Sequence, residues 1–232
     1  DAGCSLADSC PAPEFAEFVK QHPDHVVISY VNTTAAVKAV TDVVVTSTNA
    51  RQIVESFPEG TKMIFGPDRN LGNYINSITG RNMLLWDGAC HVHEQFSLEK
   101  ILDLKKQYPD AEVITHPECK QPVIQVSDFV GSTAALLKYT IKSEKKQFIV
   151  ATESGVIHEM RKKSPEKEFI PAPPNDSTCA CNECNFMRLN TMEKLYNCLK
   201  YEMPEIFVDE EVQKKAIKPI RKMLEISEKL GL

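Results

Sequence analysis

The stretch KQHPDHVVISYVN at residues 20–32 returns as KQYPDAEVITHPE at residues 106–118, 86 residues further along the chain. Both copies have the pattern of a helix end, a Pro-Asp turn and a short strand rich in β-branched residues. The same offset relates TDVVVTS at residues 41–47 to SDFVGST at residues 127–133. Self-similarity at a fixed period indicates duplicated structural units.

Helices and strands alternate within each copy, which predicts parallel β-α-β layering. In the first copy we expect strands at residues 26–30, 43–46, 63–66 and 82–86, and helices at residues 13–21, 34–39, 49–56 and 69–79 with Asp68 as N-cap of the last. The chain after residue 191 has helical periodicity and no strand pattern. We therefore predict an α/β fold of repeated three-layer α/β/α units, with short parallel sheets in a pseudo-threefold arrangement and a helical C-terminal tail.

The expected boundaries are residues 1–89 for one unit, residues 90–175 for the next, and residues 176–232 for a cysteine-containing loop and the C-terminal helices. Cys4 maps onto Cys90 under the 86-residue offset, so both cysteines mark junctions between units. A chain that opens at such a junction predicts a further unit of similar length upstream. We accordingly expect an N-terminally truncated sequence whose first unit is missing.

Composition narrows the class of protein. The 232 residues carry a formal net charge of −5, which argues against a dedicated nucleic-acid-binding protein because such proteins usually have a basic surplus. No stretch approaches 18 consecutive apolar residues, so no membrane-spanning helix is expected. Eight cysteines are too sparse for a disulfide scaffold and favour reduced thiols in a cytoplasmic protein.

The cysteines have two competing interpretations. A third member of the Cys4 and Cys90 series is expected near residue 176, where Cys179, Cys181 and Cys184 lie closest. Three thiolates gathered about a pseudo-threefold axis suit a [4Fe–4S] cluster with one open iron, or a Cys₃ zinc site. Burial as small apolar side chains is the simpler interpretation for the other cysteines, Cys10, Cys119 and Cys198.

Polar residues occupy matched strand ends in the two copies. Tyr30 corresponds to His116, and Asn32 corresponds to Glu118, under the same offset. Ligands of parallel α/β units collect beyond the carboxyl ends of the strands, so this match favours a functional site.

Other candidate side chains follow the neighbouring strands or flank Cys90. In each copy, hydroxyl side chains follow the second strand: Ser47 in the first copy, and Ser132 and Thr133 in the second. They would bind carboxylate or phosphate oxygens, or merely cap helices. In GACHVHEQF, one of His91 and His93 is expected to line a pocket beside Cys90, and the other to face solvent.

Eight motifs together resemble the quinolinate synthase family (the A protein of NAD biosynthesis): AGCSLADSCP, ISYVNTTAAVKA, VTSTNA, FGPDRNLG, GACHVHEQF, HPEC, VGSTAAL and CNECNFMRLN. The resemblance runs over essentially the whole chain. It implies three similar α/β domains around a [4Fe–4S] cluster. It also implies the condensation of iminoaspartate with dihydroxyacetone phosphate to quinolinate, phosphate and water, with L-aspartate oxidase as the pathway partner that supplies the imine.

The resemblance also assigns roles residue by residue. It implies that Cys4, Cys90 and Cys184 are the cluster ligands, that Tyr30, His116 and Glu118 are catalytic, and that Asn32, Ser47, His93, Ser132 and Thr133 bind substrate. The family's N-terminal domain has no counterpart in these residues, which predicts poor activity for the chain alone. The alternatives are a non-catalytic α/β module that binds a small carboxylate or phosphate, and a Cys₃ zinc hydrolase.

Overall fold

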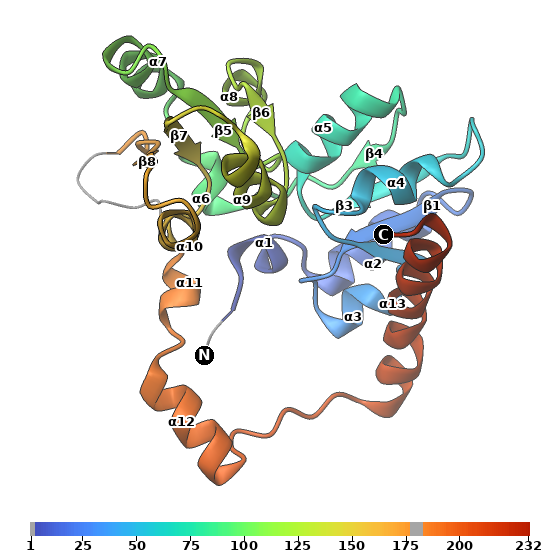
Figure 1. Ribbon diagram of the computed structural model, residues 1–232. Coiled ribbons are helices and arrows are strands. Elements are labelled where there is room, and N and C mark those ends of the chain that lie inside the picture. Colours follow the sequence, from blue (N-terminus) through green and yellow to red (C-terminus); the bar gives the residue numbers. More distant parts are fainter. Residues whose placement is uncertain (1–2, 177–182) are drawn as a thin grey trace. The chain divides into compact units, whose positions relative to one another are not determined.

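The computed structural model describes residues 3–176 and 183–232, and the chain forms two compact units (Figure 1). The first unit comprises residues 1–67, 82–88 and 185–232, and the second comprises residues 68–81 and 89–184. Cys179 and Cys181 lie outside the described residues. The domain boundaries expected at residues 89 and 175 stay a prediction.

The first unit contains a four-stranded parallel sheet with the strand order β2-β1-β3-β4. Its strands are β1 (Val26–Tyr30), β2 (Val43–Val45), β3 (Met63–Gly66) and β4 (Leu84–Leu85). A strand lies at each of the four predicted places. The one expected at residues 82–86 is shorter, because it is an edge strand that pairs with β3 only through Ile64 and Phe65.

Short helices connect these strands, and three more form the tail. They are α1 (Ser5–Asp8), α2 (Ala12–Lys20), α3 (Ala35–Lys38) and α4 (Ala50–Glu55), then α11 (Asn185–Arg188), α12 (Met192–Tyr201) and α13 (Glu210–Leu230). One core cluster packs Phe15 of α2 and Val37 of α3 against Val27 and Ile64 of the sheet. Phe15 also meets Trp86 edge-on, with ring centroids 5.4 Å apart. The tail is helical, as predicted.

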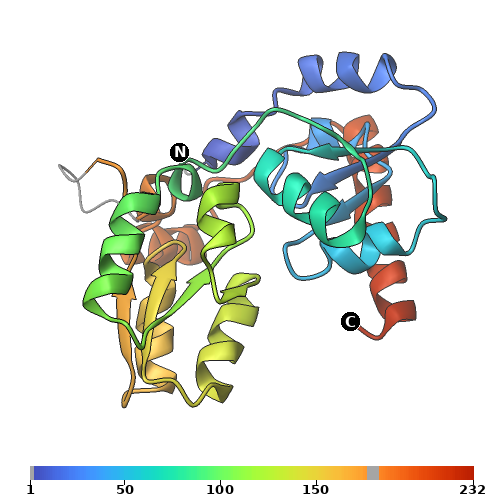
Figure 2. The same ribbon diagram turned by 90° about the horizontal axis from the view of Figure 1, so that it is seen from above.

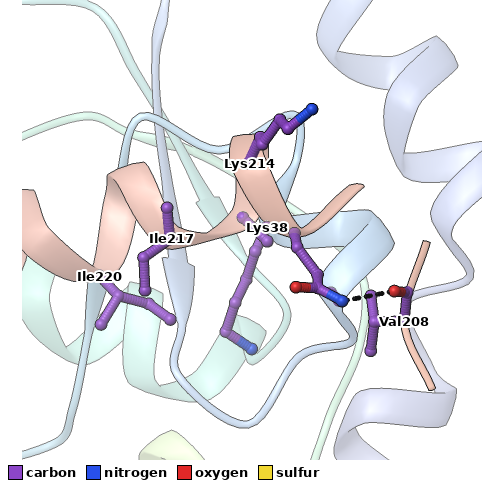
Figure 3. A pocket seen from close by; sticks show the side chains of 8 residues that line it. Lys38, Val208, Lys214, Ile217 and Ile220 are labelled. Carbon is purple, nitrogen blue, oxygen red and sulfur yellow. Dashed lines mark hydrogen bonds between the residues drawn. The ribbon is translucent and has the colours of Figure 1, made fainter. Parts of the chain in front are cut away.

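Helix α13 covers the open edge of the first sheet. It contacts the edge strand β2 and the helices α3 and α4. Because the β1–β2 and β2–β3 connections run in opposite directions across the sheet, right-handed crossovers place α3 and α4 on opposite faces of the sheet. Between α3 and α13 lies an open groove of about 560 Å³ (Figure 3), lined by Ala35, Lys38, Val208, Gln213, Lys214, Ala216, Ile217 and Ile220. None of the predicted site residues lines this groove.

Among the described residues, no helix has both the length and the apolar character needed to cross a bilayer.

The second unit repeats the same sheet, with the strand order β6-β5-β7-β8 and all pairs parallel. Its strands are β5 (Glu112–Thr115), β6 (Phe129–Val130), β7 (Gln147–Ala151) and β8 (Glu168–Pro171). Its helices are α5 (Arg69–Thr79), α6 (His91–Glu94), α7 (Leu98–Gln107), α8 (Gln121–Gln125), α9 (Thr133–Lys142) and α10 (Gly155–Lys163).

Helices cover both faces of this second sheet. One core cluster joins Val113 and Ile149 of the strands to Ile101 of α7. The other joins Ile114 of β5 to Leu136 of α9, together with side chains of α10. Figure 2 shows the strands between α7 on one side and α9 on the other. Successive strand residues point to opposite faces, so the apolar run in β5 fills both clusters.

The repeat extends to individual hydrogen bonds. Asp42 Oδ2 accepts from Val27 N at 2.8 Å, and Asp128 Oδ2 accepts from Val113 N at 2.8 Å. Both pairs are related by the 86-residue offset. The carboxylate that follows each short helix thus accepts the backbone N–H of the second residue of the central strand in each unit.

Candidate metal and substrate site

The candidate site of the second unit lies where the direction of strand connection reverses. The order β6-β5-β7-β8 puts β5 and β7 side by side, with β6 outside β5 and β8 outside β7. Such a switch point opens a crevice beyond the carboxyl ends of the two central strands. His116 directly follows β5, and Thr152 directly follows β7.

Asp68 fixes the start of two helices at this crevice. Its Oδ1 accepts from Leu71 N at 2.7 Å, which makes Asp68 the N-cap of α5, as predicted. Its Oδ2 accepts from the backbone N–H of Cys90 at 3.1 Å, and Cys90 directly precedes α6. The carboxylate is fully buried. Burial, with repulsion from Glu118, raises the pKa of Asp68 to about 7.

Cys90, His93 and Glu118 bring a thiol, an imidazole and a carboxylate together. One donor atom from each residue lies within 4.8 Å of the other two. His93 Nδ1 is 3.1 Å from Glu118 Oε2 but makes no well-aligned hydrogen bond among the described residues. Burial disfavours a charged imidazole, but polar contacts with Cys90 and Glu118 outweigh burial and raise the pKa of His93 to about 10. Of the two histidines in the His-x-His motif, His93 is buried and His91 is half-buried.

His116 stacks on His93 and has the opposite character. Burial, partly opposed by Glu118, lowers the pKa of His116 to about 4. The backbone N–H of Glu118 donates to His116 Nδ1 at 3.3 Å, so that nitrogen accepts and the ring proton sits on Nε2. Neutral His116 and positively charged His93 thus form a stacked pair.

Glu118 is held as a carboxylate between the two rings. Burial would raise its pKa, but contacts with the neighbouring imidazoles, of which His93 is the charged one, outweigh burial and keep the pKa of Glu118 below its usual value. Its carbonyl oxygen accepts from Asn70 Nδ2 at 3.0 Å, and the same amide donates to Glu94 Oε1 at 2.6 Å. These bonds fix the backbone that carries Glu118.

The matched residues of the first unit form a second polar group. Tyr30 Oη donates to Ser47 Oγ at 3.4 Å. Asn32 Nδ2 donates to Cys4 Sγ at 3.3 Å, while the buried Asn32 Oδ1 accepts no hydrogen bond from the described residues. The group lies beyond the carboxyl ends of β1 and β2, which is the place equivalent to that of His116 and Glu118.

The predicted hydroxyls differ in their local roles. Ser132 caps α9, because its Oγ accepts from Ala135 N at 3.3 Å. Thr133 is exposed at the first position of that helix. Ser47 does not cap α4, whose N-cap is Asn49.

Cys4, Cys90 and Cys184 share a local setting. Each is a half-buried free thiol that directly precedes a short helix: α1, α6 and α11, respectively. Cys90 and Cys184 both pack against the same core cluster of the second unit. Three accessible thiols, one of them already hydrogen-bonded by an amide, fit the donor set of the [4Fe–4S] cluster that the resemblance implies.

Burial is confirmed for Cys10 and Cys119 but is wrong for Cys198, which is exposed. The helical pattern of α12 placed Cys198 on an apolar face, but no residue of α12 is buried among the described residues. An apolar helical face predicts burial only where another element packs on it.

The sequence did not predict three of the contacts at this site: the bond of Asp68 to Cys90, that of Asn70 to Glu118, and that of Thr152 to His93. Thr152 Oγ1 is 3.1 Å from His93 Nε2. The position of Thr152 directly after the central strand β7 was the one sequence feature that could have marked it as a site residue. Asn70 lies inside a helix, where nothing local distinguishes it from a surface amide.

The fold and the site define an α/β enzyme with a thiol, imidazole and carboxylate centre at the carboxyl ends of parallel strands. The model of the family described as quinolinate synthetase A protein matches residues 1–225. The quinolinate synthase of Chloroherpeton thalassium is 56% identical over 227 residues, covering 98% of this chain and 70% of that protein. The Synechocystis enzyme is also 56% identical over 227 residues, or 98% of this chain and 71% of its own length. The chain belongs to the quinolinate synthase family of enzymes, so the predicted resemblance is confirmed.

Proposed function

We propose that the chain catalyses the condensation of iminoaspartate with dihydroxyacetone phosphate to give quinolinate, phosphate and water. Family membership supports the reaction. The observation that carries the assignment to residues is the buried group of His93, His116 and Glu118 beside Cys90. L-Aspartate oxidase is the proposed source of the imine, and the cytoplasm is the proposed location.

Cys4, Cys90 and Cys184 are the proposed ligands of a [4Fe–4S] cluster. This assignment requires the α/β units to lie about a pseudo-threefold axis, so that thiols from both units converge. When bound, the cluster supplies an iron with an open position that acts as a Lewis acid toward substrate oxygen. Asn32 would orient the Cys4 sulfur through the hydrogen bond from its amide.

Proton transfer is the proposed role of the second-unit group. Formation of a carbon–carbon bond requires loss of a proton from a carbon next to an imine or carbonyl. Glu118 is the proposed acceptor of that proton, since its low pKa leaves the carboxylate ionised. Neutral His116, with its proton on Nε2, is suited to donate a hydrogen bond that polarises a substrate oxygen. The proton that Glu118 accepts is then available to the oxygen that leaves as water.

The remaining predicted residues are proposed to bind the substrates' anionic groups. Tyr30, Asn32 and Ser47 present a phenol, an amide and a hydroxyl at one group of strand ends. Ser132 and Thr133 lie at the start of the ten-residue helix α9, where exposed backbone N–H groups favour oxyanions. His93 would pair with a substrate carboxylate through its positive charge.

The test is an anaerobic assay of the iron- and sulfide-reconstituted chain with dihydroxyacetone phosphate and imine generated by L-aspartate oxidase. Quinolinate detected by mass spectrometry is the expected product. Glu118→Gln should abolish the product while the iron content stays unchanged, and the exposed Glu144→Gln should serve as the matched control. Quinolinate formed by Glu118→Gln at the wild-type rate would overturn the assignment.

A further inference from the structure

We propose that Cys90, His93 and Glu118 form a binding site for a single divalent ion of the zinc class, filled when the chain holds no iron–sulfur cluster. Zinc, cobalt and ferrous ions all accept this mixture of sulfur, nitrogen and oxygen donors. The site differs from the cluster site in composition, because it uses one cysteine instead of three. All of its residues lie within the second unit.

The donor atoms lie close to the spacing that one ion requires. Tetrahedral zinc bonds of the usual lengths separate neighbouring donors by about 3.4–3.6 Å. His93 Nδ1 and Glu118 Oε2 are 3.1 Å apart, and all three donor atoms lie within 4.8 Å of one another. Closure around an ion therefore requires the His93–Glu118 pair to open slightly and the widest donor separation to shorten by up to about 1 Å. Three protein ligands leave the fourth position for water.

A second layer of contacts orients each ligand. Thr152 Oγ1 lies 3.1 Å from His93 Nε2, which directs the other ring nitrogen toward Glu118. Asp68 accepts the backbone N–H of Cys90, and Asn70 holds the backbone of Glu118. Outer contacts of this kind are typical of metal ligands, because they set the ring orientation and the tautomer.

A buried ring nitrogen faces the other donors without a well-aligned hydrogen bond. His93 is 7% exposed, and its Nδ1 lies 3.1 Å from Glu118 Oε2 but makes no hydrogen bond of good geometry among the described residues. A metal would take the place of the proton on that nitrogen. The thiolate and the carboxylate together carry two negative charges, which match a divalent cation. A chain so loaded cannot offer Cys90 to a cluster, so the two metal states exclude one another.

Cobalt is the probe, because thiolate coordination to Co²⁺ gives a charge-transfer absorption band. The metal-free chain, titrated with Co²⁺ under argon, should bind one ion with that band. Cys90→Ala should abolish the band, and His93→Gln and Glu118→Gln should each weaken binding at least tenfold. Thr152→Val should weaken it about 10–100-fold, since it removes only an orienting contact.

Cys4→Ala and Cys184→Ala are the discriminating controls. Both should bind Co²⁺ as the wild type does, although both remove a proposed cluster ligand. Loss of the band in either control, or unchanged affinity in both His93→Gln and Glu118→Gln, would overturn the site. Circular dichroism confirms that each variant is folded, and Thr152→Val tests the site if a ligand variant fails to fold. Exclusion of the cluster rests on the proposed function and has its own test: Zn²⁺ loading should block iron incorporation.

Discussion

The imidazoles of His93 and His116 stack, with ring centroids 4.6 Å apart and an angle of 22° between the planes. Two buried imidazolium ions at this distance would repel each other, so only one ring carries a charge at neutral pH. The contacts of His93 with Cys90 and Glu118 assign the charge to His93. The two histidines therefore have different roles: charged His93 forms an ion pair, and neutral His116 is left for acid–base chemistry.

Replacing His116 should separate chemistry from metal binding. We expect His116→Asn to lower kcat for quinolinate formation by about 10²-fold or more, because a positioned acid–base group contributes on that scale. The iron content and cluster absorption should stay at the wild-type level, since His116 is not a proposed ligand. The exposed His158→Asn is the matched control and should be fully active. Equal loss of iron and activity in His116→Asn would contradict this separation.

Gly88 lies where no side chain fits. A Cβ at this position would stand 2.5 Å from the carbonyl oxygen of Pro67 and 2.3 Å from Ser9 Oγ. We expect Gly88→Ala to lower the free energy of unfolding by about 1–3 kcal/mol, as overpacking usually does. Urea denaturation measures the change. Gly155→Ala is the control, because its added methyl meets only the flexible end of Glu153; equal destabilisation of the two variants would refute the steric argument.

Lys38 should make stability depend on pH. It is buried beside α13, its Nζ donates to the carbonyl of Thr33, and burial lowers its pKa below 10.5. When the pKa of a lysine is lower in the folded than in the unfolded protein, its charge destabilises the fold. This cost in the free energy of unfolding is complete below the pKa of the folded protein and disappears as pH rises to the pKa of the unfolded protein. The free energy of unfolding of Lys38→Met, relative to wild type, should therefore decrease between neutral pH and about pH 10.5.

Urea denaturation at several pH values measures this difference. The exposed Lys142→Met is the control and should show a difference that does not change with pH. A constant difference for Lys38→Met over the same range would show that the charge of Lys38 carries no cost in the fold.

Asp42 and Asp128 offer a test of the structural repeat. Each carboxylate accepts the backbone N–H of the second residue of a central strand, and alanine in its place removes that bond. We expect Asp42→Ala and Asp128→Ala each to lower the free energy of unfolding by about 1–2 kcal/mol. Asp110→Ala, in an exposed turn, should change it little. A change in only one of the two aspartates would mean that the units use the matched bond differently.

The sequence was informative about the site wherever the repeat applied. His116 and Glu118 were found because their counterparts, Tyr30 and Asn32, follow the equivalent strand. Asp68 was recognised only as a helix cap, since its second bond reaches Cys90, 22 residues away. Cys198 was misplaced because periodicity reports an apolar face but not what covers that face.

The amino-acid sequence alone was sufficient to fix the order of strands and helices, their parallel layering and the 86-residue duplication. These features depend on local patterns: β-branched runs, turn residues and capping side chains act within a few positions of one another. The convergence of Cys90, His93 and Glu118 to within 4.8 Å is a property of the folded second unit. These groups come from a loop, a short helix and a strand end, and they meet only when α6 and the loop before it pack against β5 and β7.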